Sequence, residues 1–224
     1  GEMLLEADLD GYFFTGSYKT GKYIAQKVAS KLVPVQLELG GKDPLYVMED
    51  VADVKQAAIN AAEGAFYNNG QSCCAVERVY VHEKIYDEFV AAFVEEVSQI
   101  ADAKNKGARV LYGGERWGDK GYYLTPAVLS NVDHSMDLMK EESFGPIIGI
   151  QKVKNDQEAF ELMKDTAYGL TAAVFSGNEL RAKELVEGLP TGTVYVNCCD
   201  RVSPNLPWTG RKNSGMGVTL SYMG

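Results

Sequence analysis

Hydrophobic positions along the first third of the chain switch between a strand-like and a helix-like period. An apolar run at residues 12–14 is followed by residues 21–32, where apolar side chains recur at helical spacing. A short apolar stretch at 33–39, a glycine-containing turn at 40–44 and a second apolar run at 45–48 come next. This pattern predicts a strand at 12–14, a helix at 21–32 and, after the short apolar stretch and the turn, a further strand at 45–48.

The same alternation continues to the end of the chain. Small apolar residues follow one face of a predicted helix that opens near Asp50 and stops at Asn68-Asn69-Gly70, and residues 84–100 form an amphipathic helical pattern. Further strands are predicted at 78–81, 109–112, 123–128, 147–153, 172–175 and 193–196, and further helices at 156–164 and 179–187. Alternating strands and helices predict an α/β fold with a largely parallel sheet.

Composition and charge narrow the class of partner. The chain has 224 residues, of which 22 are Lys or Arg and 31 are Asp or Glu, so its formal net charge is −9. A negative chain of this kind is a poor ligand for nucleic acid or for an anionic membrane, because both are held by an excess of cations. No run approaches the ~18 apolar residues of a membrane span, and the acidic first residues do not resemble a signal peptide. We therefore expect a small-molecule partner and a cytoplasmic or organelle-matrix location.

The four cysteines form two adjacent pairs, Cys73-Cys74 and Cys198-Cys199. This spacing matches neither a metal site nor the disulfide framework of a small secreted fold, so we expect reduced thiols and no bound metal. Cys73 lies just beyond the Asn69-Gly70 turn, where a thiolate can be exposed to a ligand and act as a nucleophile. The alternative is that it serves as a small buried apolar residue.

A single carboxylate, Glu38, interrupts the apolar run before Gly40-Gly41. Burial favours the neutral form of a carboxyl group, which suits a general base near neutral pH. The alternative is a glutamate paired with a basic side chain. The two glycines would allow a ligand or another backbone segment to approach closely.

Two further segments suggest ligand contacts. Residues 16–22 satisfy the GxxxxGK pattern of a phosphate loop, but Tyr23 replaces the Ser or Thr that would ligate magnesium. The segment therefore predicts an NTPase loop, a metal-free helix start that attracts a pyrophosphate, or a plain turn. In residues 140–146, two acids precede Phe144 and a Gly-Pro turn, and they would either bind sugar hydroxyls or form a solvated charge run.

These segments, taken in order, resemble the motifs of the aldehyde dehydrogenase superfamily, and the resemblance extends over nearly the whole chain. The matching segments are Phe14-Thr-Gly-Ser17, Leu37-Glu-Leu-Gly-Gly-Lys42, Gly70-Gln-Ser-Cys73, Glu141-Glu-Ser-Phe-Gly-Pro146, Tyr168-Gly-Leu170 and Gly210-Arg-Lys-Asn-Ser-Gly215. The resemblance implies a three-layer αβα sheet domain with the remnant of a Rossmann-type cofactor domain. Residues 1–38 would belong to the cofactor domain and 39–208 to the catalytic domain, and 209–224 would return towards the cofactor domain.

The resemblance implies oxidation of an aldehyde to a carboxylic acid with NAD or NADP. Cys73 would attack the aldehyde to form a thiohemiacetal and then a thioester, which a water activated by Glu38 would hydrolyse. A glutamate at this position argues for hydrolysis over transfer to coenzyme A. The resemblance also implies a homodimer or homotetramer.

The resemblance further implies the positions of the binding residues. Gly16 and Ser17 would lie near the cofactor pyrophosphate, and Asn197 near the substrate tunnel. The Leu39 backbone would face the nicotinamide amide, with Glu142 binding the nicotinamide ribose and Phe144 packing near the ring.

Parts of the family pattern have no counterpart in this sequence. The first half of the cofactor domain, with its oxyanion asparagine, would precede Gly1. A loop and a helix that the family carries are missing between Ile100 and Ala101. We therefore expect an omitted segment at that junction. If the chain is continuous there, the alternative is a homologue that keeps the fold without the chemistry.

Overall fold

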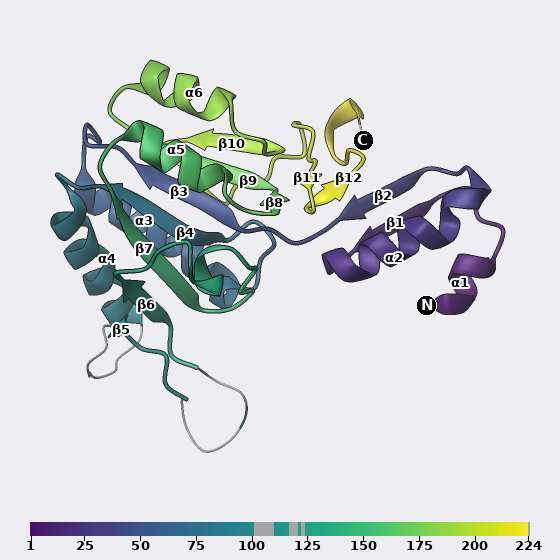
Figure 1. Ribbon diagram of the computed structural model, residues 1–224, viewed down its shortest axis with the longest axis horizontal. Helices are drawn as coiled ribbons and strands as arrows, with labels where there is room; N and C mark the ends of the chain where they lie inside the picture. The colour runs from purple at the N-terminus through teal and green to yellow at the C-terminus, as the bar shows by residue number, and fades with distance from the viewer. Residues whose placement is uncertain (101–109, 117–120, 122–123, 224) are drawn as a thin grey trace.

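Seven strands form the central sheet of the protein, which the computed structural model describes for residues 1–100, 110–116, 121 and 124–223 (Figure 1). The strand order is β10-β9-β3-β4-β7-β6-β5, with only the β5–β6 pair antiparallel. The strands are β3 (Asp43–Val47), β4 (Val76–His82), β5 (Val110–Tyr112), β6 (Ala127–Ser130), β7 (Ile147–Val153), β9 (Thr171–Phe175) and β10 (Thr193–Val196). The prediction of a largely parallel sheet is confirmed.

Helices cover both faces of this sheet. Helices α3 (Val54–Phe66) and α4 (Tyr86–Ile100) lie on one face, and α5 (Asp156–Lys164) and α6 (Glu179–Glu187) lie on the other (Figure 1). Successive residues of a strand point to opposite faces, so Leu45 joins the core under α3 and α4 while Tyr46 joins the core under α5 and α6. The three-layer αβα arrangement is confirmed.

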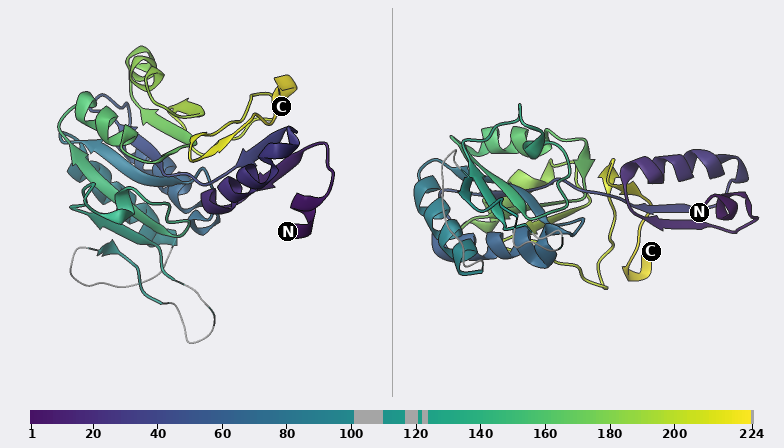
Figure 2. Two further views of the ribbon diagram at one scale, coloured as in Figure 1. Left: turned by 45° about the vertical axis from the view of Figure 1, so that its right-hand side comes forward. Right: turned by 90° about the horizontal axis from the view of Figure 1, so that it is seen from below.

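A smaller sheet forms an arm that projects from one end of the seven-stranded unit (Figures 1 and 2). Its strand order is β1-β2-β12, with β1 and β2 parallel and β12 antiparallel to β2. The arm contains α1 (Glu2–Glu6), β1 (Tyr12–Thr15), α2 (Tyr18–Val28), β2 (Val35–Glu38) and β12 (Gly215–Met216). The end of the chain therefore returns to pair with its beginning.

Several boundaries differ from the sequence prediction. Helix α2 begins three residues earlier than predicted because the Ser17 side chain caps it, accepting a hydrogen bond from the Thr20 N–H. Helix α3 begins later, because Asp53 is its cap. The predicted turn at 40–44 is shorter, since β3 already begins at Asp43. The strand predicted at 123–128 lies at 127–130, although its first residue falls outside the described part of the chain.

The shortest elements were not predicted. They are β8 (Tyr168–Gly169), β11 (Arg211–Lys212), α1, β12 and the 3-10 turns Ala29–Lys31, Tyr67–Gly70, Asp137–Met139 and Ser221–Met223. The pairs β11–β8 and β12–β2 join segments far apart in the sequence, which local patterns do not report. Within the described residues no helix is long and apolar enough to cross a bilayer. All four cysteines are free thiols.

Candidate active site

Three loops meet at the edge of the central sheet where β3, β4 and β7 begin. They are residues 39–42, which link β2 to β3, residues 71–75, which lead into β4, and residues 140–146, which lead into β7. The three strands are parallel neighbours, so their first residues lie along one edge of the sheet. This topology brings the predicted base, nucleophile and acidic segment to one place.

The glycines at positions 40 and 41 allow these loops to touch. A Cβ atom on Gly41 would lie 2.4 Å from the carbonyl oxygen of Cys73, and one on Gly40 would lie 2.4 Å from the Glu142 carboxylate oxygens. The Gly41 N–H donates a hydrogen bond of 3.0 Å to Glu142 Oε1. The expected close approach is therefore confirmed. A side chain at Gly41 would separate the loops, and one at Gly40 would displace the Glu142 carboxylate.

Cys73 is half-buried rather than sealed in the apolar core. Its thiol pKa lies below the ordinary value, chiefly because the Cys74 side chain hydrogen-bonds to it, while burial and the negative charge of Glu38 act in the opposite direction. The neighbouring Cys74 is buried, and its Sγ donates to Asp200 Oδ1 at 3.0 Å. The same contact with Cys73, together with burial, raises the pKa of Cys74. Of the two adjacent thiols, Cys73 is the one that forms a nucleophilic thiolate more readily.

Glu38 is the last residue of β2 and is half-buried. Its Oε1 accepts hydrogen bonds from Gln36 Nε2 at 2.9 Å and from Thr219 Oγ1 at 3.0 Å. Both donors are neutral, and none of the ion pairs among the described residues includes Glu38. The alternative of a glutamate tied to a basic partner is therefore wrong for the described chain.

Glu142 and Phe144 lie on the third loop. Glu142 is half-buried and held by the Gly41 N–H, and burial raises the pKa of its carboxyl group. Glu141 is exposed, so the predicted charge run divides into one solvated and one engaged carboxylate. Phe144 has a left-handed backbone (φ 47°), and its side chain remains 46% exposed at the surface of the site.

The arm contributes the start of α2. The Gly16 N–H donates to the Glu38 carbonyl oxygen at 3.1 Å, which places this helix start beside the end of β2. Ser17 caps the helix and is exposed, whereas Leu39 is buried and its N–H donates to the Ser214 carbonyl oxygen. A helix start presents unpaired backbone N–H groups to an anion.

The phosphate-loop interpretation of residues 16–22 is wrong. Such a loop must wrap around the phosphates, but residues 18–22 are already helical. Gly21 lies within the helix and packs against Leu39, because a Cβ at Gly21 would lie 2.5 Å from Leu39 Cδ2. The helical geometry leaves the metal-free helix start as the only anion-binding interpretation of this segment.

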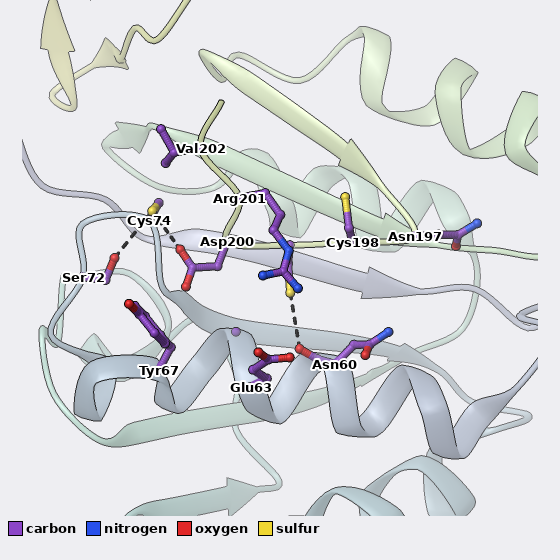
Figure 3. A pocket seen from close by; sticks show the side chains of 12 residues that line it. Asn60, Glu63, Tyr67, Ser72, Cys74, Asn197, Cys198, Asp200, Arg201 and Val202 are labelled. Carbon is purple, nitrogen blue, oxygen red and sulfur yellow. Dashed lines mark hydrogen bonds between the residues drawn. The ribbon is translucent and has the colours of Figure 1, made fainter. Parts of the chain in front are cut away.

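A cavity of about 510 Å³ adjoins the nucleophile loop (Figure 3). Ser72 and Cys74, the two neighbours of Cys73, line it, and Asn197 lies along the same cavity. Asn197 also ties two strands together, since its Oδ1 accepts the Ser176 N–H at 2.8 Å. The position of Asn197 near a substrate tunnel stays a prediction, and the structure places the residue at the wall of this cavity.

Sequence reasoning did not identify several other residues of this cavity. Tyr67 and Glu63 project from the end of α3, while Asp200 and Arg201 come from the loop after β10 (Figure 3). Their only signal in the sequence was proximity to the two cysteine pairs. The structure thus brings Glu38, Cys73, Glu142 and Phe144 to the meeting loops, with Gly16, Ser17 and Leu39 beside them on the arm and Asn197 in the cavity.

Comparison with known proteins places this arrangement in a family. The model of the aldehyde dehydrogenase family matches residues 1–101 and 97–224. An aldehyde dehydrogenase of Davidiella tassiana is 40% identical over 95% of this chain and 49% of its own length. The chloroplastic betaine aldehyde dehydrogenase of Atriplex hortensis is 37% identical over 97% of this chain and 49% of its own length.

A solved structure shows the same fold. The betaine aldehyde dehydrogenase of Staphylococcus aureus, in complex with NAD⁺, superposes with a TM-score of 0.88 at 32% identity, covering 96% of this chain and 49% of that one. The present chain spans about half the length of these relatives. Since the family match extends over the whole sequence, the chain belongs to the aldehyde dehydrogenase family.

Proposed function

We propose that this chain carries the thiol site of an NAD(P)-dependent aldehyde dehydrogenase that releases a carboxylic acid. The observation that carries the proposal is the half-buried Cys73, whose lowered thiol pKa favours the thiolate at the point where the Glu38 and Glu142 loops meet. Membership of the family supports the reaction class.

The proposed chemistry uses one sulfur atom twice. The Cys73 thiolate adds to the aldehyde carbon, forming a C–S bond and moving an electron pair onto the oxygen, which the Cys73 backbone N–H would stabilise. Loss of hydride from that carbon leaves a thioester. Glu38 then takes a proton from a water molecule as it attacks the thioester, and the C–S bond breaks to return the thiolate and the acid.

The residues present fit a dinucleotide on the arm side of the site. The start of α2 offers backbone N–H groups to a pyrophosphate, and the half-buried Glu142 offers a carboxylate to ribose hydroxyls. Gly16, Ser17 and the Leu39 backbone would line the path between them, with the exposed Phe144 ring beside the nicotinamide. When bound, NAD or NADP supplies the acceptor for the hydride.

An aldehyde panel, assayed by the absorbance of the reduced cofactor, tests the proposal. We expect Cys73→Ala to abolish turnover, because the pKa values of the neighbouring thiols Cys74 and Cys198 are raised and disfavour the thiolate. Glu38→Gln should retain the first burst of reduced cofactor and then accumulate a thioester, because hydride loss precedes the step that needs the base.

Cys198→Ala is the matched control, since this thiol also lines the cavity but has a pKa raised by burial. It should still reduce the cofactor, unlike Cys73→Ala, because its thiol is not the proposed nucleophile. Full activity in Cys73→Ala would overturn the proposal. No reduction of either cofactor by the unsubstituted protein with any aldehyde would favour a homologue without the chemistry.

The predicted junction at Ile100 and Ala101 is a separate proposal, and Ala101 lies outside the described residues. We propose that a segment is omitted there, supported by the two family matches, which meet at residues 97–101. A peptide containing Ile100 joined directly to Ala101, found by mass spectrometry of the purified protein, would contradict this. A cytoplasmic or organelle-matrix location and a homodimer or homotetramer remain predictions.

A further inference from the structure

A third carboxylate at the site, Glu77, has no part in the chemistry proposed above. It lies in β4, at the centre of the seven-stranded sheet, and is only 4% exposed. Carboxylates are rarely buried to this extent without a partner. Its contacts show that the partner is Lys42 and that the pair binds the loop at Ser143 and Phe144.

Both oxygens of Glu77 are directed at the loop that carries Glu142 and Phe144. Oε1 accepts the Phe144 N–H at 2.9 Å, and Oε2 accepts the Ser143 N–H at 2.8 Å. Oε2 also accepts Lys42 Nζ at 2.7 Å, and Lys42 Nζ donates to Ser143 Oγ at 3.0 Å. Glu77 and Lys42 therefore bind two consecutive residues of the loop, Ser143 and Phe144, through backbone N–H groups and the Ser143 side chain.

A contribution to the free energy of unfolding does not by itself explain the buried ion pair between Lys42 and Glu77. The Lys42 side chain is fully buried, and burial lowers its pKa while Glu77 opposes that shift. An ion pair taken out of water is commonly no more stabilising than apolar residues of the same size. What an apolar pair would lack is an acceptor for the two backbone N–H groups.

The loop backbone that Glu77 binds is strained at Phe144. Phe144 has φ 47°, a region that residues with a side chain seldom occupy and that persists only where the surroundings enforce it. Glu77 binds the N–H groups on one side of this bend, and Gly41 binds Glu142 on the other. Together these contacts set both the position of the Glu142 carboxylate and the direction of the Phe144 ring.

We propose that Glu77, paired with Lys42, is a positioning residue that holds residues 142–144 in the geometry required by the cofactor. The inference rests on the proposed function, in which Glu142 binds the nicotinamide ribose. Glu77 itself touches neither cofactor nor substrate. Its loss should therefore weaken cofactor binding and leave the capture of aldehyde by Cys73 largely intact.

Steady-state kinetics of Glu77→Gln test the proposal. A glutamine offers one acceptor oxygen in place of two and turns an amide N–H₂ towards either Lys42 or the loop backbone. We expect the KM for the cofactor to rise roughly tenfold or more, as for a lost charge-assisted hydrogen bond, while the KM for the aldehyde changes less than about twofold.

The double variant Lys42→Met with Glu77→Leu covers the case in which the single variant does not fold. It removes both buried charges, so it avoids the unpaired buried lysine that Glu77→Gln leaves. It should nevertheless show the raised KM for the cofactor, because the loop N–H groups have lost their acceptor. A purely structural role for the pair predicts no such change.

Asp156→Asn is the matched control, because it weakens an ion pair with Arg181 and a hydrogen bond with Tyr46 at a distance from this loop. It should lower the melting temperature without raising the KM for the cofactor. An unchanged cofactor KM in both Glu77 variants would overturn the proposal.

Hydrogen exchange of the peptide covering residues 140–147, measured without cofactor, gives a readout independent of activity. Exchange at this peptide should accelerate in Glu77→Gln and stay unchanged in Asp156→Asn. Unchanged exchange in Glu77→Gln would overturn the positioning role even in an active enzyme. Accelerated exchange in a protein that oxidises no aldehyde would instead support the grip on the loop and count against the proposed function.

Discussion

The seven-stranded unit and the arm bury their apolar residues to very different extents. In β3, Leu45, Tyr46 and Val47 have no exposed surface, and helices lie on both faces of the sheet. In the arm, Phe13 is 79% and Leu32 is 94% exposed. Within the described residues, the unit therefore gains more than the arm from the burial of apolar surface, which is the main favourable contribution to folding.

The reactive groups lie where these two regions meet. Glu38 is the last residue of the arm strand β2, whereas Cys73 and Glu142 come from loops of the seven-stranded unit. Gly40 and Gly41 form the short link between the two regions and contact both loops. A change in the arm can therefore alter the site without unfolding the unit, and a change deep in the unit should unfold both.

The largest effect is expected from a large-to-small change in the core of the unit. Phe89 is fully buried and stacks near Phe93, with ring centroids 5.8 Å apart. Phe89→Ala should lower the free energy of unfolding by about 3–5 kcal/mol, the usual range for this substitution in a well-packed core. Chemical denaturation followed by circular dichroism measures the loss. A loss below about 1 kcal/mol would contradict the assignment of stability to the unit.

A smaller change in the free energy of unfolding is expected when pH falls towards 5. The histidine contribution to this change comes from the seven-stranded unit, because both histidines of the sequence lie outside the arm. His134 Nε2 lies 2.7 Å from Tyr80 Oη, and His134 Nδ1 lies 2.7 Å from Asp165 Oδ2. Burial lowers the pKa of His134 below 6.5, and the nearby charges of Arg78 and Lys140 act in the same direction, while Asp165 opposes them.

The sign of the pH effect follows from this lowered pKa. As pH falls below about 6.5, the unfolded chain takes up a proton at this position before the folded chain does, so stability should decrease. His134→Gln should remove that part of the decrease between pH 6.5 and 5, as measured by thermal unfolding. An identical pH dependence in the variant would show that His134 does not contribute to it.

The smallest effect is expected in the arm. Phe13→Thr replaces an exposed side chain of β1 while keeping a residue that favours strands, so the free energy of unfolding should change by less than about 0.5 kcal/mol. Denaturant titration alongside Phe89→Ala gives the direct comparison. A loss comparable to that of Phe89→Ala would show that the arm packs as tightly as the unit in solution.

Much of the fold was predictable because its longer elements have strong periodic patterns. The small residues that recur at helical spacing in α3 predicted a helix, because they form its buried face. The apolar run of β7 predicted a strand, because most of that strand is buried. The two-residue strands β8, β11 and β12 were not predicted. They exist through pairing with distant segments, and so few residues carry no period of their own.

The site residues also differ in whether the sequence could predict them. Short contiguous motifs predicted four of them, which are Cys73, Glu38, Glu142 and Phe144. The cavity residues Tyr67 and Asp200 were missed because they come together from separate elements. Glu77 was missed as well, although an acid inside the apolar strand β4 was a local signal that it needed a partner.

The sequence by itself determined the α/β class, the order of the long elements and the residue types needed for thiol chemistry, since these depend on local periodicity and on the chemistry of single side chains. Only the tertiary structure decided that the first residues of β3, β4 and β7 share one edge and that Glu77 pairs with Lys42 beneath the Phe144 loop. Both outcomes depend on strand order and on the packing of residues far apart in the chain, which no local pattern encodes.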